Sequence, residues 1–317
     1  MKQSDFIQLF EDMLFCRRFE ERVLTAYTSQ KFSGFCHLHI GQEAVCVGIQ
    51  KALKPEDHMI SGYRSHTQAI MKGLTPKEVF AELLGRVDGC ARGKGGSMHM
   101  FSKEKRFYGG HGIVGGQAPI ATGIGFEIHY NDKDEVVVCY LGDAAMNQGQ
   151  VYEAMNMAET WSLPVLFVIE NNQYGMGTDI RRTTSVEYLS ARALGFDMQH
   201  SKMDGMNVLK VIEHTQPIVD QMRKDKRPHL LEALTYRYKG HSVSDPGHYR
   251  TKEEVTAWQD KDPLIQLAAE LKKLGHSDDE LEQLDQKVRQ RVKDIEKEAE
   301  SSPFSDPKEA WMHVLAP

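Results

Sequence analysis

In the middle of the chain, two short apolar runs lie on either side of a longer mixed segment, a pattern that predicts a strand, a helix and a second strand. Residues 136–141 and 165–169 are short apolar runs rich in β-branched side chains, and between them lies a segment of helix length that ends near Trp161. Two strands joined by a helical crossover run parallel in one sheet. We therefore expect an α/β fold built on a mainly parallel sheet.

A polar side chain follows each of these two predicted strands. Asp143 comes directly after the first strand, and Asn172 comes 29 residues later, after the second. Open parallel sheets bind ligands at the carboxyl ends of their strands, so one carboxylate and one amide oxygen should face a common crevice. Magnesium prefers such oxygen ligands and is commonly completed by phosphate oxygens and water. The pattern predicts a magnesium ion with a bound diphosphate.

Helical periodicity and capping signals organise the two ends of the chain. Ser4 or Asp5 can cap a first helix that runs to about Tyr27, within an N-terminal segment 1–30. Near the other end, Ser277 and Glu280 form a capping-box pattern before an apolar stripe on a charged helix, within a helical extension over 262–317. No repeat or low-complexity linker interrupts the chain. We predict one domain over residues 1–317, with helices on both faces of the sheet.

Two further strand ends carry candidate functional side chains. A short strand over 59–66 delivers Arg64, whose fork-shaped guanidinium can clamp a diphosphate or form a surface ion pair. The last predicted strand, over 229–236, leads into a loop that contains His241. A histidine there can act as an acid or base, or be a solvated loop residue. His37 and His39 lack the further ligands of a zinc site, so we expect no metal between them.

Residues 110–115 match the G-x-G-x-x-G pattern of nicotinamide and flavin dinucleotide sites by letter. That pattern needs an apolar strand directly before it, whereas residues 102–108 are largely polar. We interpret the segment as a loop with exposed backbone before a helix that starts near Gln117, with Pro119 in its first turn. A dinucleotide-dependent dehydrogenase remains the alternative.

Composition excludes several classes of partner and location. The net charge of −6 provides no basic footprint for nucleic acid or anionic membranes. No apolar run approaches the ~20 residues that span a bilayer. The N-terminus lacks the features of a secretory or transit peptide, and the five cysteines contain no C-x-x-C pair. We expect a cytoplasmic protein, or a mitochondrial matrix protein if a transit peptide has been removed.

Taken together, the motifs resemble those of the alpha subunits of thiamine-diphosphate-dependent 2-oxo acid dehydrogenases. Their sequences are closest to those of the pyruvate-specific members. The resemblance covers nearly the whole chain. It rests on GFCHL with GQEA at 34–44, YRSH at 63–66, GKGGSMHM at 93–100, FYGGHGIVG at 107–115, GD at 142–143, ENN at 170–172, and GHS with DPG at 240–247.

The resemblance implies roles for individual residues. Magnesium would be held by the Asp143 carboxylate, the Asn172 side chain and the Tyr174 carbonyl. Catalytic roles fall to His241, which faces the diphosphate and the reacting centre, and to His37, which lies near the substrate with Phe35. The implied cofactor contacts are Tyr63, Arg64, Ser102, Gly112, Val114, Asp143, Ala144, Ala145, Asn172, Tyr174 and His241.

The family fold is an α/β sandwich around a mainly parallel sheet, and the family works as an alpha-two beta-two heterotetramer. The implied reaction is decarboxylation of a 2-oxo acid with thiamine diphosphate and Mg²⁺, followed by reductive acyl transfer to a lipoyl group on a partner acyltransferase. The beta subunit supplies the glutamate that activates the cofactor, so this chain alone is expected to be inactive. Pyruvate is the expected substrate; acetoin and branched-chain 2-oxo acids are the alternatives.

The chain departs from the family pattern at two places. The usual Gly-Asp-Gly is Gly142-Asp143-Ala144 here, which adds a methyl group where a glycine allows positive φ or close approach. The loop over 240–250 resembles a kinase-regulated loop and keeps Ser242, but His248 replaces its more distal serine. Phosphorylation of Ser242 is therefore a disfavoured hypothesis. A structural subunit without catalysis is the last alternative, and the retained Asp143 and Asn172 argue against it.

Overall fold

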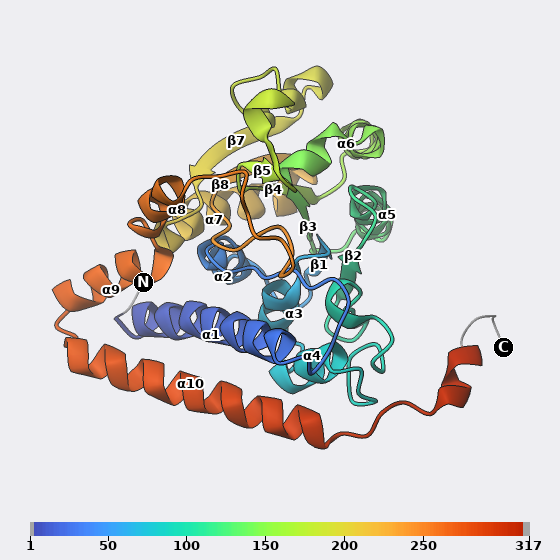
Figure 1. Ribbon diagram of the computed structural model, residues 1–317. Coiled ribbons are helices and arrows are strands. Elements are labelled where there is room, and N and C mark those ends of the chain that lie inside the picture. The colour runs from blue at the N-terminus through green and yellow to red at the C-terminus, as the bar shows by residue number, and fades with distance from the viewer. Residues whose placement is uncertain (1–2, 313–317) are drawn as a thin grey trace.

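The computed structural model describes residues 3–312 and shows a twisted parallel sheet covered by helices on both faces (Figure 1). Six strands of the described chain form this sheet in the order β2-β1-β3-β4-β8-β7, and every neighbouring pair is parallel. Their bounds are β1 His58–Gly62, β2 Phe107–His111, β3 Val137–Gly142, β4 Val165–Asn171, β7 Gln199–Asp204 and β8 His229–Leu234. This confirms the predicted α/β fold with a parallel sheet.

Alternation along the central strand divides the core into two layers. Val137 and Cys139 of β3 pack into one apolar cluster, whereas Val138 and Tyr140 pack into another on the opposite face. Helices α5 Gln117–Tyr130 and α6 Gly149–Thr160 cover the first face. The second face is covered by α1 Gln3–Thr28, α2 Glu43–Lys51, α3 His66–Lys72, α4 Pro76–Leu83 and α7 Val208–Asp225.

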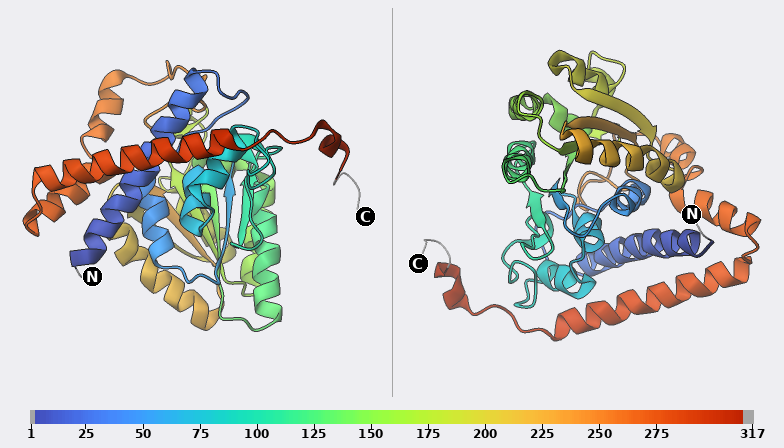
Figure 2. Two further views of the ribbon diagram at one scale, coloured as in Figure 1. Left: turned by 90° about the horizontal axis from the view of Figure 1, so that it is seen from below. Right: turned by 180° about the vertical axis from the view of Figure 1, so that it is seen from behind.

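The C-terminal helices wrap around the second layer. After α8 Lys252–Gln259, helices α9 Pro263–Lys273 and α10 Asp278–Ser301 extend along α1, and α10 crosses the molecule as a long rod (Figure 2). The predicted capping box at Ser277 is present with both of its hydrogen bonds. Val288 and Val292 of the predicted stripe are buried against α1 and α4.

A buried ion cluster ties this extension to the core. The Arg17 guanidinium of α1 donates to the Glu43 carboxylate at 2.6 Å and to the Asp262 carboxylate at 2.9 Å, just before α9. Removing one partner from such a cluster leaves a buried charge unpaired, which typically costs about 3–5 kcal/mol. The cluster therefore joins α1, α2 and α9 strongly.

One local expectation needs correction. The polar run before residue 107 predicted no strand, yet β2 Phe107–His111 forms there, because its backbone pairs with β1 although its sequence is rich in glycine. Two helices, α3 and α4, follow β1, because Gly73 adopts φ 110° and ends the first. Thr75 then caps the second with a complete capping box.

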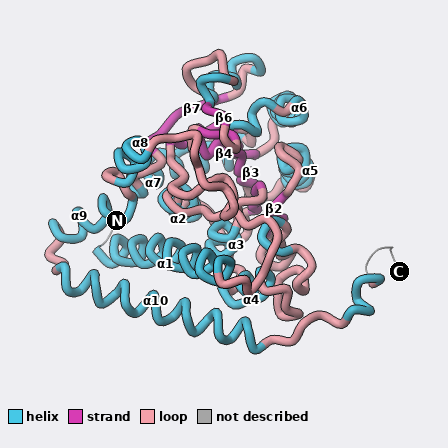
Figure 3. The backbone as a smooth tube through the Cα atoms, in the orientation of Figure 1, coloured by secondary structure: helices cyan, strands magenta, loops and turns pink. Residues whose placement is uncertain are grey.

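Long loops lie between several of these elements, including the connections from α1 to α2 and from β8 to α8 (Figure 3). A short antiparallel ribbon, β5 Tyr174–Gly175 with β6 Thr178–Asp179, follows β4. Among the described residues, no helix is long and apolar enough to cross a membrane.

Candidate functional site

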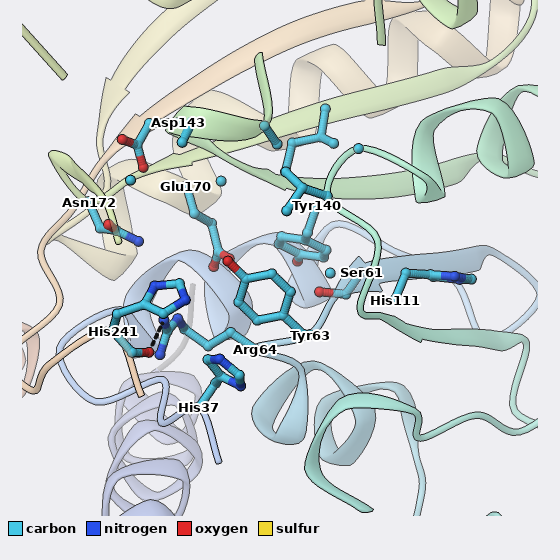
Figure 4. A pocket seen from close by; sticks show the side chains of 18 of the residues that line it. His37, Ser61, Tyr63, Arg64, His111, Tyr140, Asp143, Glu170, Asn172 and His241 are labelled. Carbon is cyan, nitrogen blue, oxygen red and sulfur yellow. Dashed lines mark hydrogen bonds between the residues drawn. The ribbon is translucent and has the colours of Figure 1, made fainter. Parts of the chain in front are cut away.

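A cavity of about 510 Å³ opens at the carboxyl ends of the central strands (Figure 4). It lies where β1, β3 and β4 end and where the loops after α1, β2 and β8 meet. Almost all of the predicted site residues line it: Phe35, His37, Tyr63, Arg64, Gly112, Val114, Asp143, Ala144, Ala145, Asn172, Tyr174 and His241. The fold thus brings together residues from six separate parts of the chain.

Ser102 is the predicted cofactor contact that the structure does not bring to this cavity. Its backbone forms an isolated antiparallel bridge with Phe107, and its hydroxyl accepts a hydrogen bond from the Lys105 backbone N–H at 3.3 Å. In this structure Ser102 therefore closes the turn before β2.

Asp143 stands where β3 passes into a short 3₁₀ helix, Asp143–Asn147. Its side chain is buried, and its Oδ2 atom has no hydrogen-bond partner. Burial raises the pKa of this carboxyl to about 6, although the backbone N–H groups of Asn172 and Ala144 act in the opposite direction. A buried carboxylate oxygen without a partner is costly, so Asp143 is placed to receive a cation.

The other two predicted metal ligands lie beside Asp143 and are held by one arginine. The fully buried Arg237 donates from Nη1 to the Asn172 Oδ1 atom and to the Tyr174 carbonyl, both at 3.1 Å. Its Nη2 donates to the Met176 carbonyl at 3.0 Å. The guanidinium therefore fixes the loop after β4 with its oxygens close to Asp143.

This donor set fits a hard cation. It comprises one carboxylate, one amide oxygen and one backbone carbonyl, which are ligands that magnesium accepts when a diphosphate and water complete its shell. No group of three histidine, cysteine or carboxylate side chains in the described chain could hold a metal by itself. The site thus suits an ion that arrives with further oxygen ligands.

Ala144 does not require the backbone freedom of the glycine it replaces. It lies in the 3₁₀ helix and does not have positive φ. A Cβ atom at Gly175 would lie only 2.5 Å from the Ala144 methyl group, whereas Gly142 faces open space. The methyl group of Ala144 therefore packs against the bare backbone of Gly175, and the two positions complement each other.

Three rings from separate segments gather on one wall of the cavity. His37 lies 4.5 Å from Tyr63 and 5.2 Å from His241, measured between ring centroids. Burial lowers the pKa of His37 to about 2 and that of His241 to about 4, and the nearby Arg64 charge adds to both shifts. Both imidazoles are therefore neutral at physiological pH and can accept a proton or donate one N–H.

Arg64 is placed at the junction of the loops that carry these rings. Its guanidinium donates to the Leu38 carbonyl at 2.6 Å. It also donates to the His241 carbonyl at 2.8 Å (Figure 4). Burial lowers its pKa to about 10, so it stays protonated. The side chain lines the cavity as predicted and also holds His37 and His241 on the same wall.

The loop after β8 is connected to the predicted metal ligands through Tyr249. Arg237 donates to the Tyr249 hydroxyl, which donates to the Asp245 carboxylate, both at 2.8 Å. That carboxylate accepts the His241 backbone N–H at 2.6 Å. Ser242 in the same loop is buried, with its hydroxyl 3.0 Å from that of Ser244.

Sequence reasoning missed several residues that line the cavity. Glu170 lies within the ENN motif and faces it, with Oε1 2.7 Å from the His39 ring. Gln117 and Tyr140 each present a buried polar atom without a partner. The local sequence around Arg237 shows only a cationic residue after the strand β8, which does not mark it as a site residue. These polar atoms, with His37 Nδ1 and Asp143 Oδ2, make the cavity suited to a polar ligand.

The G-x-G-x-x-G segment contributes to this same cavity. His111, Gly112, Val114 and Gly115 line it, between β2 and the start of α5. The predicted helix start at Gln117 is confirmed. Although β2 includes the first glycine of this pattern, Gly110, the segment belongs to the edge of the site that holds Asp143 and Asn172.

The fold and the site define an α/β protein with a polar, cation-compatible cavity across the carboxyl ends of a parallel sheet. Residues 11–308 match the model of the family described as "Dehydrogenase E1 component". The chain belongs to this dehydrogenase E1 component family.

Several relatives align with nearly the whole chain. It is 46% identical over 315 residues to the pyruvate dehydrogenase E1 component subunit alpha of Rhizobium meliloti, covering 99% of this chain and 90% of the relative. The same-named protein of Zymomonas mobilis is also 46% identical, with 99% and 89% covered. The somatic mitochondrial form of Homo sapiens is 42% identical over 320 residues, with 100% and 81% covered.

Proposed function

We propose that this chain is the alpha subunit of a pyruvate dehydrogenase. It takes part in the oxidative decarboxylation of pyruvate with thiamine diphosphate and Mg²⁺ and in the reductive acetylation of a lipoyl group on a partner acyltransferase. The proposal is supported by family membership, by relatives that carry this name, and by the predicted motifs that line one cavity.

The observation that carries the proposal is the unpartnered Oδ2 atom of Asp143 beside the oxygens of Asn172 and Tyr174. Together they would supply three oxygen ligands to a bound Mg²⁺ ion. Diphosphate oxygens and water supply the remaining ligands in a typical magnesium site. We assign Mg²⁺ to these three residues.

The remaining residues bind and orient the reactants. Tyr63 and Arg64 lie on the wall where a diphosphate would be contacted, and a guanidinium suits that role because of its charge and planar donors. Bound thiamine diphosphate supplies the electron sink for decarboxylation. The neutral imidazoles of His37 and His241 accept or donate a proton at their ring nitrogens beside the substrate. Phe35 stands at the cavity mouth, 69% exposed.

The exposed mouth is consistent with completion by a beta subunit in an alpha-two beta-two heterotetramer. Phe35, Ile113 and Met176 are large apolar side chains at or beside the cavity that remain more than half exposed in the isolated chain. Such a patch around a site is typical of a protein interface. We assign the activating glutamate to that partner. We further propose that the acyl group is transferred to a lipoyl domain of the dihydrolipoyl acyltransferase.

The location in the cell stays a prediction. Relatives include bacterial proteins and a human protein named as mitochondrial. We propose a cytoplasmic location for this chain, and the matrix if a transit peptide has been removed.

Co-expression with the candidate beta subunit tests the function. The purified complex is assayed with pyruvate, acetoin and branched-chain 2-oxo acids, with lipoyl domain as acceptor. We expect turnover with pyruvate that requires thiamine diphosphate and Mg²⁺. Preference for another of these substrates would move the assignment to that branch of the family.

Thermal shift of the same complex separates the remaining alternatives, because a ligand of the folded state raises its melting temperature. Thiamine diphosphate with Mg²⁺ should raise the melting temperature, and NAD should not. A shift with NAD alone would contradict the proposal. Cofactor binding without turnover of any of the three substrates would identify a non-catalytic subunit.

A further inference from the structure

A chain of three buried polar side chains runs behind the cavity wall that carries His37. The Glu20 carboxylate of α1 lies 2.9 Å from the Nδ1 atom of His66, and the Nε2 atom of His66 lies 2.8 Å from the Ser97 hydroxyl. Glu20 and His66 are fully buried, and Ser97 is 6% exposed. The residues come from α1, the start of α3 and the 3₁₀ helix Gly96–Met98.

Hydrogen-bonding rules fix the direction of the two end contacts of this chain. A buried carboxylate accepts, so Nδ1 of His66 donates to Glu20. The Nε2 atom of His66 and the Ser97 hydroxyl form the next hydrogen bond of the chain. The lone pairs of Ser97 remain free, and they accept the backbone N–H of His37 at 3.3 Å. The chain thus ends on the backbone of a residue that faces the cavity.

The same carboxylate holds the loop of His37 at a second point. The other oxygen of Glu20 accepts the backbone N–H of His39 at 3.1 Å. The Cys36 carbonyl accepts the backbone N–H of Val243 at 2.9 Å, which joins this loop to the one that carries His241. The backbone around His37 is therefore fixed on both sides.

The order of carboxylate, histidine and serine matches that of a hydrolase triad, but the position of Ser97 argues against nucleophilic attack. Ser97 does not line the cavity, although its neighbour Met98 does. Its hydroxyl faces the His37 backbone. An activated nucleophile must reach a substrate atom, and this one is covered.

We propose that Glu20, His66 and Ser97 are positioning residues that hold the His37 imidazole against the substrate in the active site. The inference rests on the proposed function, because it assigns to His37 a role in that reaction. The His37 ring has no hydrogen bond at Nδ1 and is located by packing against Tyr63 and by its own backbone. A displacement of about 1 Å at a reacting group can cost on the order of a hundredfold in rate.

The test is a double-mutant cycle in the assembled alpha–beta complex. Ser97→Ala and His37→Ala are made singly and together, and kcat/KM for pyruvate is measured. We expect Ser97→Ala to lower kcat/KM about tenfold or more, mainly through kcat. We expect the double variant to be no worse than His37→Ala alone, because both changes remove the same contribution. Glu20→Gln should lower kcat/KM in the same way as Ser97→Ala.

Ser201→Ala is the matched control. The Ser201 hydroxyl also contacts two histidines, His229 at 2.8 Å and His214 at 2.9 Å, but it lies away from the cavity. We expect this variant to keep the wild-type kcat/KM. The melting-temperature shift caused by thiamine diphosphate with Mg²⁺ should be unchanged in both serine variants, because neither serine faces the proposed cofactor.

Amide hydrogen exchange provides a readout that does not depend on turnover. In Ser97→Ala, the peptide that contains residues 36–39 should exchange faster, since the His37 N–H loses its acceptor; Ser201→Ala should leave it unchanged. Additive losses in the cycle, wild-type kcat/KM in Ser97→Ala, or unchanged exchange of this peptide would overturn the inference. Absence of pyruvate turnover in the wild-type complex would instead contradict the proposed function, and the exchange result would still decide this inference.

Discussion

Arg237 and Asn172 are joined by a 3.1 Å hydrogen bond from the guanidinium to the side-chain amide oxygen. The same guanidinium nitrogen reaches the Tyr174 carbonyl at the same distance. Both oxygens are proposed ligands of the metal. The buried Arg237 guanidinium therefore holds two of the metal ligands in place. Positioning ligands before the ion binds lowers the ordering cost of binding.

Replacing Arg237 by lysine tests this arrangement. Lysine keeps the charge but lacks the planar fork that serves five acceptors at once. We expect Arg237→Lys to weaken Mg²⁺-dependent binding of thiamine diphosphate about tenfold or more, as measured by calorimetry on the complex. The control Arg227→Lys removes a similar fork that contacts Glu159 and the Asp197 carbonyl, outside the cavity. Equal affinities in the two variants would contradict the positioning role.

The complementarity of Ala144 and Gly175 gives a second prediction. Gly175→Ala would place two methyl groups about 2.5 Å apart, so one segment must move. Overpacking of this kind typically costs about 1–3 kcal/mol. We expect a lower melting temperature and weaker cofactor binding in Gly175→Ala, and recovery of both in the Ala144→Gly, Gly175→Ala double variant.

Gly195→Ala is the control for that experiment, because nothing lies within 4 Å of a Cβ atom at Gly195. It should leave cofactor binding unchanged. If the double variant bound the cofactor as weakly as Gly175→Ala, contact between residues 144 and 175 would not be the cause of the lost affinity.

A third prediction concerns acid sensitivity away from the site. Burial lowers the pKa of His229 to about 4, and the neighbouring His214 and His200 add to the shift. Its pKa when folded is below the ordinary value of about 6.5, so the unfolded chain binds the proton more readily. Stability is therefore lost as the pH falls from about 6.5 towards 4. This one group should lower the free energy of unfolding by about 2 kcal/mol between about pH 7.5 and about pH 5.

His229→Gln should remove that part of the pH dependence. The measurement is guanidinium unfolding of the full chain at both pH values and at one fixed protein concentration. The control is His129→Gln, at an exposed position of α5, and it should retain the wild-type difference. A wild-type pH dependence in His229→Gln would contradict the assignment.

Much of the fold was predictable because local patterns and tertiary structure agree. The apolar runs that form β3 and β4, the helix between them and the capping box of α10 are all present. Strand β2 was missed because its glycine and aromatic residues follow a charged turn, and only pairing with β1 makes them a strand. Tertiary contacts override local propensity in such cases.

The candidate site was predictable where a residue follows a strand directly. Asp143 and Asn172 could be placed by that rule alone, whereas the role of Tyr174 came from resemblance. Arg237 could not be found, because its importance lies in four contacts with residues distant along the chain. Ser102 was carried over from the family pattern, and here it closes a turn outside the cavity.

The central claim is that Asp143 holds the magnesium ion through which thiamine diphosphate binds. The most direct measurement is the affinity of the alpha–beta complex for thiamine diphosphate, with and without Mg²⁺, in Asp143→Ala. The control is Asp204→Ala, which removes a carboxylate at the end of β7, outside the cavity. We predict that Asp143→Ala loses the effect of Mg²⁺ on cofactor affinity and that Asp204→Ala keeps it. Wild-type Mg²⁺-dependent affinity in Asp143→Ala would contradict the claim.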